Sequence, residues 1–218
     1  KGVSVDFKKN VDRSKSVAKQ LSKGIEFLMK KNSITHFSGL GKLESKNHIN
    51  IIQKSRSKQI SAKNIIIATG AKPKTFESIN IDGKYIIGSK QALNLIEVPK
   101  KIIIVGSGAI GCEFAFYFNS FGADVEIIEM QKRILPMEDS EISAALKDSF
   151  TSSGIKIHNN SKVKSIDKLN TKIKVNVVTE NGSLQIDGNI ALLATGVEGN
   201  INNIGLKDVG VKSENGSI

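Results

Sequence analysis

A glycine-rich segment is the part of this 218-residue sequence whose residue types and spacing most directly indicate chemistry. It follows a β-branched run over 101–105 and consists of Gly106, Ser107, Gly108, Ala109, Ile110 and Gly111. The first glycine permits a tight turn, the second lets a pyrophosphate approach the backbone, and the third lets a helix pack closely on a strand. Backbone N–H groups at the helix start then face the phosphates. Because a strand pattern precedes this segment and a helix pattern follows it, we expect a dinucleotide-binding site.

An acidic residue lies where the second strand of this unit would end. Glu129 is 18 residues beyond Gly111, at the place where a carboxylate accepts hydrogen bonds from the adenosine ribose. A 2′-phosphate there would meet a like charge, and the nearest arginine is Arg133. We therefore predict NAD rather than NADP as the nucleotide.

Two residues beside the glycines have alternative interpretations. Glu113 is a candidate ligand contact, but a carboxylate in the first turn of a helix also stabilises the positive end of the helix dipole. Cys112 is the only cysteine, which excludes an internal disulfide and a C-x-x-C redox or zinc motif. A helix N-terminus lowers a thiol pKa, although most such cysteines are buried as small apolar residues. His36, His48 and His158 lack the spacing of metal ligands, so we expect no metal site.

Alternating strand and helix patterns surround the glycine segment and predict an α/β fold with a central parallel sheet. The run over 101–105 is continuously apolar, as expected for a strand buried on both faces. Pro99 follows a helix pattern and marks the best boundary between two parts of the chain. Before Pro99, apolar spacing and turn residues predict a helix over 12–31, strands over 34–37, 49–52 and 64–68, and a helix over 89–97. After it they predict a strand over 101–105, a helix over 109–121, a strand over 124–129, and a helix capped by Asp139 or Ser140 and ending at 153. Strands over 155–157, 162–168 and 172–179, a hairpin turn at 181–182 and a strand over 190–194 complete the prediction.

Charge is distributed unevenly along the chain. The net charge is +11, of which residues 1–98 carry +12 and residues 99–218 carry −1. Only three of the 32 basic residues are arginines and aromatic residues make up 5%, so we expect no nucleic-acid binding. The lysines indicate a solvated face, with a docking surface for an acidic partner as the alternative. Because no stretch is long and apolar enough for a membrane span or a signal peptide, we expect no membrane association.

The tripeptide Ala-Thr-Gly occurs twice, at 68–70 and 194–196, each time after an apolar strand pattern. Glycine at the end of a strand permits a sharp turn. The repetition suggests two similar domains, each with a glycine turn at the carboxyl end of a strand.

These motifs together resemble the dihydrolipoamide dehydrogenase family of flavin disulfide reductases, the E3 components of 2-oxo acid dehydrogenase complexes. The most specific stretch is residues 102–129, IIIVGSGAIGCEFAFYFNSFGADVEIIE, followed by Arg133-Ile134-Leu135-Pro136 and Glu138-Asp139. Further similarity lies in GIEFLMKKN, in Gly39-Leu40-Gly41-Lys42, in the first Ala-Thr-Gly and in ATGVEGNINNIGL.

The resemblance implies a Rossmann-like NAD-binding domain with a β-meander over 99–218, inserted after part of an FAD-binding domain over 1–98. It implies FAD contacts, which would come from Gly41, Thr69, Gly70 and Ala71. It also implies that NAD contacts would come from Gly106, Ser107, Gly108, Ala109, Ile110 and Gly111 at the pyrophosphate, Glu113 near the nicotinamide, Glu129 at the ribose, Val163 at the adenine, and Ala194, Thr195 and Gly196 along the cofactor. Many family members have Arg where this chain has Val197, so the cofactor contact of that position is not carried over.

The implied activity is oxidation of protein-bound dihydrolipoamide by a cysteine disulfide and FAD, with reduction of NAD⁺. The family's redox cysteine pair, first FAD glycine loop and C-terminal His-Glu base are absent from this sequence, which therefore looks like an internal segment of a longer enzyme. We expect no catalytic residue and no dithiol oxidation from this chain alone. The resemblance further implies a homodimeric parent, a lipoylated acyltransferase (E2) partner, and a location in bacterial cytoplasm or the mitochondrial matrix. The alternatives are another NADH-linked flavin disulfide reductase or NADH oxidase, and a free-standing NAD-binding module.

Overall fold

The computed structural model describes residues 5–74 and 79–218. The chain forms two compact units, each assembled from two stretches of sequence. Unit 1 comprises Lys1–Ser14 and Pro73–Gly196, and unit 2 comprises Lys15–Lys72 and Val197–Ile218.

Unit 1 is organised around a five-stranded parallel sheet in the order β5-β12-β6-β7-β8. The strands are β5 (Ile86–Ile87), β6 (Lys101–Val105), β7 (Asp124–Ile128), β8 (Lys156–His158) and β12 (Ile190–Leu193). The predicted parallel sheet is confirmed, and β6 has the bounds that its apolar run predicts. Its three isoleucines are fully buried, because both faces of the sheet are covered.

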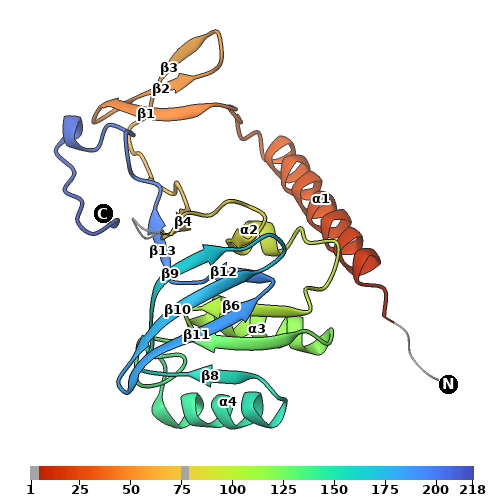
Figure 1. Cartoon of the computed structure of the whole chain (residues 1–218). Helices are drawn as coiled ribbons and strands as arrows, with labels where there is room; N and C mark the ends of the chain where they lie inside the picture. The colour runs from red at the N-terminus through yellow and green to blue at the C-terminus, as the bar shows by residue number, and fades with distance from the viewer. Residues whose placement is uncertain (1–4, 75–78) are drawn as a thin grey trace. The chain divides into compact units, whose positions relative to one another are not determined.

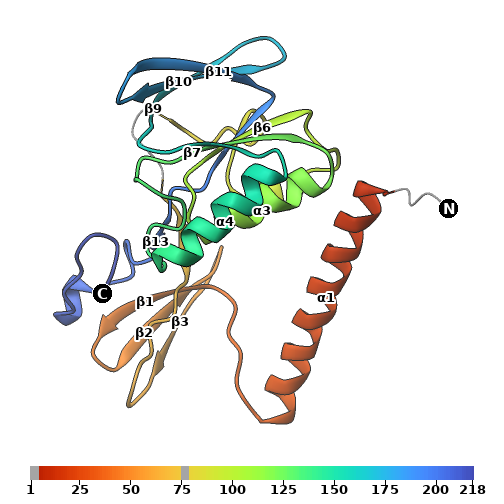
Figure 2. The ribbon, with the colours of Figure 1, turned by 90° about the horizontal axis from the view of Figure 1, so that it is seen from below.

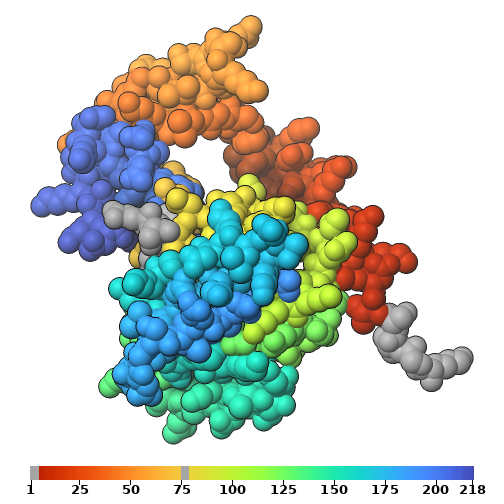
Figure 3. All heavy atoms as spheres, in the orientation of Figure 1, coloured from red at the N-terminus to blue at the C-terminus, as the bar shows by residue number. Residues whose placement is uncertain are grey.

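Helices cover one face of this sheet and a β-meander covers the other (Figure 2). Ile102 and Ile104 pack with residues of α3 (Ala109–Ser120) and α4 (Ser140–Ser152), whereas Ile103 packs with the meander. The meander consists of β9 (Lys162–Lys168), β10 (Ile173–Thr179) and β11 (Gly182–Gly188). The hairpin of β10 and β11, blue in Figure 3, lies over the side of unit 1 that faces the viewer. Alternating side chains of β6 thus serve two separate cores.

The turns of unit 1 follow the predicted residue types with small shifts. Asp139 caps α4, since its side chain accepts a hydrogen bond from Glu141 N at 2.8 Å. The predicted hairpin at 181–182 is present, but Thr179 pairs with Gly182, so its two loop residues are 180 and 181. Gly182 has a φ of +124° and begins β11. The helix α2 (Ser89–Ala92) is shorter than the predicted span of 89–97.

The first turns of α1 (Phe7–Lys31) belong to unit 1. Phe7 and Val11 are buried in the helix-side core, and the Phe7 ring lies 5.0 Å from the ring of Phe121. The helix begins five residues before the predicted start at 12, because the Asp6 carboxylate accepts a hydrogen bond from Lys9 N at 3.0 Å. Asp6 therefore satisfies an N–H group of the first turn that would otherwise lack a partner.

Unit 2 contains an antiparallel sheet and the rest of α1 (Figure 1). The sheet consists of β1 (Leu40–Ser45), β2 (His48–Ile52) and β3 (Ser57–Ser61), of which β2 matches the strand predicted at 49–52. Leu43 forms a small core with Ile204 and Leu206, beside the 3₁₀ turn η1 (Lys207–Val209). The strands predicted at 34–37 and 64–68 are wrong, because these residues have no strand pairing in the structure. β-Branched residues favour an extended backbone, but a strand also needs a neighbouring strand with which to pair.

Two short strands follow directly after the two Ala-Thr-Gly segments. The strands β4 (Ala71–Pro73) and β13 (Val197–Gly199) form a two-stranded sheet. Lys72 and Glu198 form an ion pair across it at 3.1 Å. The limits of both units fall at these strands, so contacts divide the chain differently from the boundary expected at residue 98. Residues 86–87 belong to unit 1 because they pair with β12, while the assignment of FAD and NAD to 1–98 and 99–218 stays a prediction.

In the parts of the chain that the structure describes, no helix has the length and apolar character needed to cross a membrane.

Candidate dinucleotide-binding site

The glycine segment forms the connection between β6 and α3. Gly106 has a φ of +99°, and a Cβ there would lie 2.5 Å from the carbonyl oxygen of Ala194. Gly111 is buried, and a Cβ there would overlap the carbonyl oxygen of Gly106. Both positions therefore require glycine, the first for the turn and the second for close packing of helix and strand.

Gly108 differs from these two glycines because its surroundings are open. It is the N-cap of α3 with an ordinary φ of −66°, and a Cβ there would meet nothing within 4 Å. No side chain caps this end of α3, so N–H groups of the first turn are free to bind an anion. Ala109 and Ile110 begin the helix at this open end. The segment therefore combines room for a phosphate with donors that face it.

Glu129 lies directly after β7 and is held against the glycine segment. Its Oε2 accepts hydrogen bonds from Ser107 N at 2.8 Å and Ser107 Oγ at 2.7 Å, and its Oε1 accepts one from Gln131 N at 2.8 Å. Glu129 is 6% exposed. The carboxylate expected at the ribose position is thus beside the expected phosphate position.

The second Ala-Thr-Gly segment lies at the same edge of the sheet. Ala194 follows β12, and its N–H donates to the carbonyl of Val105 at 2.8 Å. Gly196 has a φ of +97°, and the Thr195 hydroxyl donates to the carbonyl of Lys74 at 3.3 Å. Because the carboxyl ends of parallel strands meet at one edge, Ala194 borders the glycine segment.

Val163 lies on β9, whose start is joined to the strand end that carries Glu129. The N–H of Ser161 donates to the carbonyl of Glu129 at 2.9 Å. The Val163 side chain is half-buried and packs against the cores beneath the meander. Val163 therefore lies two residues after Ser161, which bonds directly to Glu129, and it is on the meander side of the sheet.

The structure contradicts the position expected for Glu113 in the first turn of α3 and bears out the burial expected for Cys112. No acidic residue lies in that turn, so the expected position of Glu113 there is wrong; its side chain is exposed. Cys112 is buried, and its Sγ donates to the carbonyl of Ser107 at 3.3 Å. Burial, with the charge of Glu129, raises the pKa of the Cys112 thiol to about 11. The thiol is therefore protonated near neutral pH, as suits a small buried residue.

The loop after β7 was not predicted to contact the glycine segment. Leu135 adopts a φ of +44°, and its N–H donates to the carbonyl of Ser107 at 2.9 Å. Ile134 is fully buried beside it, and its carbonyl accepts a hydrogen bond from the Ser143 hydroxyl. The only sequence signal was the motif at 133–136, whose contact with Ser107 needs the folded chain.

An ion cluster across β6, β7 and β8 was also missed. The buried carboxylate of Glu126 contacts Lys101 Nζ at 2.6 Å, His158 Nε2 at 2.9 Å and Lys156 Nζ at 3.3 Å. Burial raises the pKa of Glu126, but hydrogen bonds from Lys101, His158 and Lys156 outweigh it and lower this pKa to about 2. Adjacent parallel strands bring these residues together, which spacing along the chain does not reveal. The cluster joins three strands of the sheet, and the carbonyl of its His158 accepts a hydrogen bond from Glu129 N at 2.8 Å.

The residues expected at FAD lie in unit 2 and are only partly brought together. Thr69 and Gly70 line a cavity of about 380 Å³ with Gly199 and Ile201. Asn200 donates through its side chain to the Thr69 carbonyl at 3.1 Å and through its backbone to the Gly70 carbonyl at 2.9 Å. Gly41 on β1 and Ala71 on β4 are exposed and do not line this cavity.

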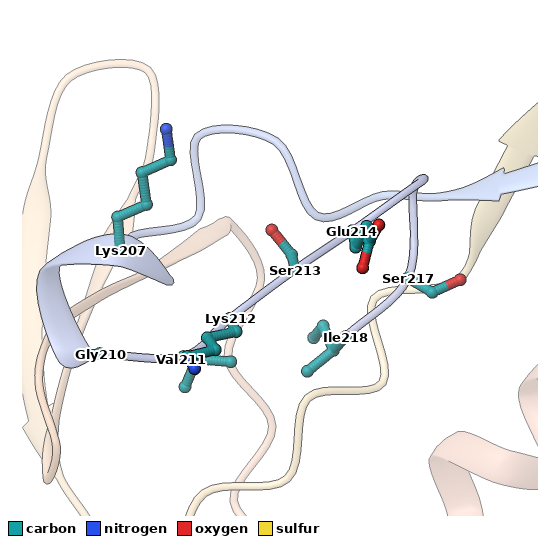
Figure 4. A pocket seen from close by; sticks show the side chains of 8 residues that line it. All are labelled: Lys207, Gly210, Val211, Lys212, Ser213, Glu214, Ser217 and Ile218. Carbon is teal, nitrogen blue, oxygen red and sulfur yellow. The ribbon is translucent and has the colours of Figure 1, made fainter.

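Another cavity, about 760 Å³, lies near the end of the chain and contains none of the expected site residues (Figure 4). It is an open hollow around Lys207 and the turn in which Glu214 and Ser217 exchange backbone hydrogen bonds. No group of three or more His, Cys, Asp or Glu among the described residues is arranged to hold a metal ion.

A parallel sheet with this glycine turn and an acidic strand end is the arrangement of the Rossmann-type dinucleotide-binding fold. Residues 3–218 match the family described as pyridine nucleotide-disulphide oxidoreductase, and the chain belongs to that family. The expected resemblance is confirmed, and the members of this family are oxidoreductases that use FAD and a nicotinamide nucleotide.

Relatives of this chain share the name dihydrolipoyl dehydrogenase. The chain is 38% identical to a dihydrolipoyl dehydrogenase of Chlorobaculum tepidum, over 99% of this chain and 46% of that protein. It is 32% identical to the dihydrolipoyl dehydrogenase of Bacillus subtilis, over 100% of this chain and 48% of that protein. The chain thus spans about half the length of the curated relatives it matches.

Solved structures show the same fold. The chain superposes on a flavoprotein disulfide reductase, RclA of Escherichia coli, with a TM-score of 0.87 and 25% identity over 98% of this chain and 48% of the other. LpdA of Mycobacterium tuberculosis gives a TM-score of 0.89 at 24% identity, with the same coverage. The predicted α/β class with a parallel sheet is therefore confirmed as half of a flavoprotein disulfide reductase fold.

Proposed function

We propose that the chain supplies the NAD-binding part, and one wall of the FAD site, of a dihydrolipoyl dehydrogenase. The observation that carries the proposal is the buried Glu129 carboxylate held directly beside an open, uncapped glycine turn. Names of the relatives support the activity, and the family supports the pair of cofactors. In the parent enzyme NAD⁺ accepts a hydride from reduced FAD.

The residues present fit a nicotinamide dinucleotide. The N–H groups at Gly108, Ala109 and Ile110 would bind the pyrophosphate, because a Cβ at Gly108 meets no atom within 4 Å and no side chain caps this helix. The remaining members of the site would position the two ends of the nucleotide. They are Gly106, Ser107 and Gly111 at the turn, Glu129 at the ribose, Val163 at the adenine, Glu113 near the nicotinamide, and Ala194, Thr195 and Gly196 along its length.

The residues present also fit part of a flavin site. Thr69 and Gly70 line a cavity whose volume, about 380 Å³, is at the lower end for small-molecule sites. These residues would bind one portion of FAD, together with Ala71, which follows Gly70, and Gly41 on β1. The chain's contribution is to hold this wall in place, since Asn200 binds the carbonyls of Thr69 and Gly70.

The dithiol chemistry of the parent requires a pair of cysteines. The sequence has one cysteine, Cys112, which is buried under the glycine segment with a raised pKa. We therefore infer that this chain binds NAD but does not oxidise dihydrolipoamide by itself. Partners of the parent would be a second copy of the enzyme and the lipoylated E2, in bacterial cytoplasm or the mitochondrial matrix. Another NADH-linked flavin disulfide reductase remains the second candidate, which the similarity to RclA favours.

Calorimetric titration with NADH and NADPH tests the proposal. We expect NADH to bind more tightly, and Glu129→Ala to weaken NADH roughly tenfold through loss of charge-assisted hydrogen bonds to the ribose. Tighter binding of NADPH would overturn the ribose role of Glu129. An assay with free dihydrolipoamide, FAD and NAD⁺ should show no turnover by this chain, and measurable turnover would refute the inference about the missing cysteine pair.

A further inference from the structure

Ser107 is the one member of the glycine segment whose side chain bonds to another part of the site. Its N–H and hydroxyl both donate to Glu129 Oε2, at 2.8 and 2.7 Å. Its carbonyl accepts from Leu135 N at 2.9 Å and from Cys112 Sγ at 3.3 Å. The residue is 0% exposed. All polar atoms of Ser107 therefore have partners within the protein, and two of them bind the same carboxylate oxygen.

These bonds hold the Glu129 side chain before any nucleotide is present. Hydrogen bonds to a charged carboxylate at 2.7–2.8 Å are short and strong. With Gln131 N on Oε1, three of about four acceptor positions of the carboxylate are filled. A glutamate ordered in this way has less rotamer freedom to lose when a ligand binds. One acceptor position remains, on Oε1, for a ribose hydroxyl.

We propose that the Ser107 hydroxyl is a positioning group that holds the Glu129 carboxylate for the ribose and thereby sets the preference for NAD over NADP. The inference rests on the proposed function. With both Ser107 donors on Oε2 the carboxylate is held facing a 2′-phosphate, whereas with the backbone N–H alone it can rotate and relieve the like-charge repulsion. The same hydrogen bond thus favours one nucleotide and disfavours the other.

Ser107→Ala isolates the hydroxyl, because the backbone N–H bond to Glu129 remains. The chain offers a matched control in Ser143→Ala. Ser143 is equally buried in unit 1, and its hydroxyl donates to the Ile134 carbonyl rather than to Glu129. A loss of stability from removing a buried serine hydroxyl should be similar in the two variants.

Titration of both variants with NADH and NADPH tests the inference. We expect Ser107→Ala to weaken NADH by about 3- to 10-fold, with NADPH affinity unchanged or higher, and Ser143→Ala to leave the ratio of the two affinities at the wild-type value. Ser107→Ala should have no further effect on NADH in a Glu129→Ala background, because the hydroxyl acts through Glu129. Equal weakening of both nucleotides by Ser107→Ala, or an undiminished effect in the Glu129→Ala background, would overturn the inference.

Crystal structures of the wild type and Ser107→Ala without nucleotide separate this inference from the proposed function. Positioning by the hydroxyl requires that the Glu129 carboxylate occupy a second orientation in Ser107→Ala. A carboxylate in its wild-type orientation in the variant contradicts it. If the wild-type chain binds neither nucleotide, the proposed function fails, and these two structures decide whether Ser107 positions Glu129.

Discussion

Units 1 and 2 bury their apolar side chains to very different extents. In unit 1 both faces of the parallel sheet are covered, and Phe118 of α3 is 0% exposed. In unit 2 the apolar stripe of α1 formed by Val17, Leu21, Ile25 and Leu28 is exposed, and Phe27 is 64% exposed. The α1 stripe of unit 2 therefore lacks the second surface that burial requires, whereas α3 of unit 1 packs against the sheet.

Charge follows the same division. Unit 2 has 14 basic and 5 acidic residues, a net of +9, whereas unit 1 has a net of +2. In unit 2 Lys72 pairs with Glu198, while the charged groups of unit 1 include the buried cluster around Glu126. The difference indicates that unit 1 owes its stability to internal contacts that mutations can remove, and that similar mutations in unit 2 should have smaller effects.

The largest expected effect is that of a phenylalanine in the core of unit 1. Phe118→Ala should lower the free energy of unfolding by about 3–5 kcal/mol, because it leaves a cavity among packed rings. Phe27→Ala on α1 is the matched change and should stay within about 0.5 kcal/mol. Denaturant unfolding of both variants measures the difference. Comparable losses would show that the apolar face of α1 is covered in solution and would contradict the difference in burial between the two units.

Removal of the buried charge of unit 1 comes next. The pKa of Glu126 is lowered to about 2 from an ordinary 4.5, so its contribution is present above pH 4.5 and is lost as pH falls through about 2. Glu126→Gln should lose about 2–3 kcal/mol at neutral pH. The difference from wild type in thermal or denaturant unfolding should shrink between pH 4.5 and 2.

The control for this charge is an exposed ion pair, that of Asp187 and Lys172 at 3.0 Å. Asp187→Asn should have a much smaller effect, because solvent screens exposed pairs. A stability difference for Glu126→Gln that does not change over the acidic range would contradict the assignment of the lowered pKa.

A smaller effect is expected at the glycine turn. Gly111→Ala should cost about 1–3 kcal/mol, since the added Cβ overlaps the Gly106 carbonyl and the helix must move. Gly108→Ala meets no atom within 4 Å; it should leave unfolding near wild type and weaken NADH binding. Thermal unfolding and NADH titration of the two variants separate packing from ligand access, and a stable Gly111→Ala variant would contradict the close helix packing.

The smallest expected effect is a gain of stability in unit 2. Gly24 lies within α1, and a Cβ there meets nothing within 4 Å. Gly24→Ala should raise stability by about 0.5–1 kcal/mol through helix propensity alone. Urea unfolding followed by circular dichroism measures this gain, and a loss would indicate that this side of α1 is packed against another surface.

Local patterns were sufficient for the elements that carry the nucleotide site. The strand over 101–105, the glycine turn and the helix behind it were predicted correctly, because an apolar β-branched run and obligatory glycines leave few other conformations. The same is true of β9, whose bounds match the predicted strand over 162–168. The strands predicted at 34–37 and 64–68 failed because a strand requires a hydrogen-bonding neighbour, which composition does not specify.

Partners of buried polar groups required the tertiary structure. Ser107 and Glu129 are 22 residues apart and meet because β6 and β7 end side by side in parallel register. The raised pKa of Cys112 likewise follows from burial beneath the glycine turn rather than from its place near a helix N-terminus. Glycines and apolar periods act through the local backbone and can be recognised along the chain. Hydrogen bonds and pKa values depend on distances between remote residues, which the packed sheet alone determines.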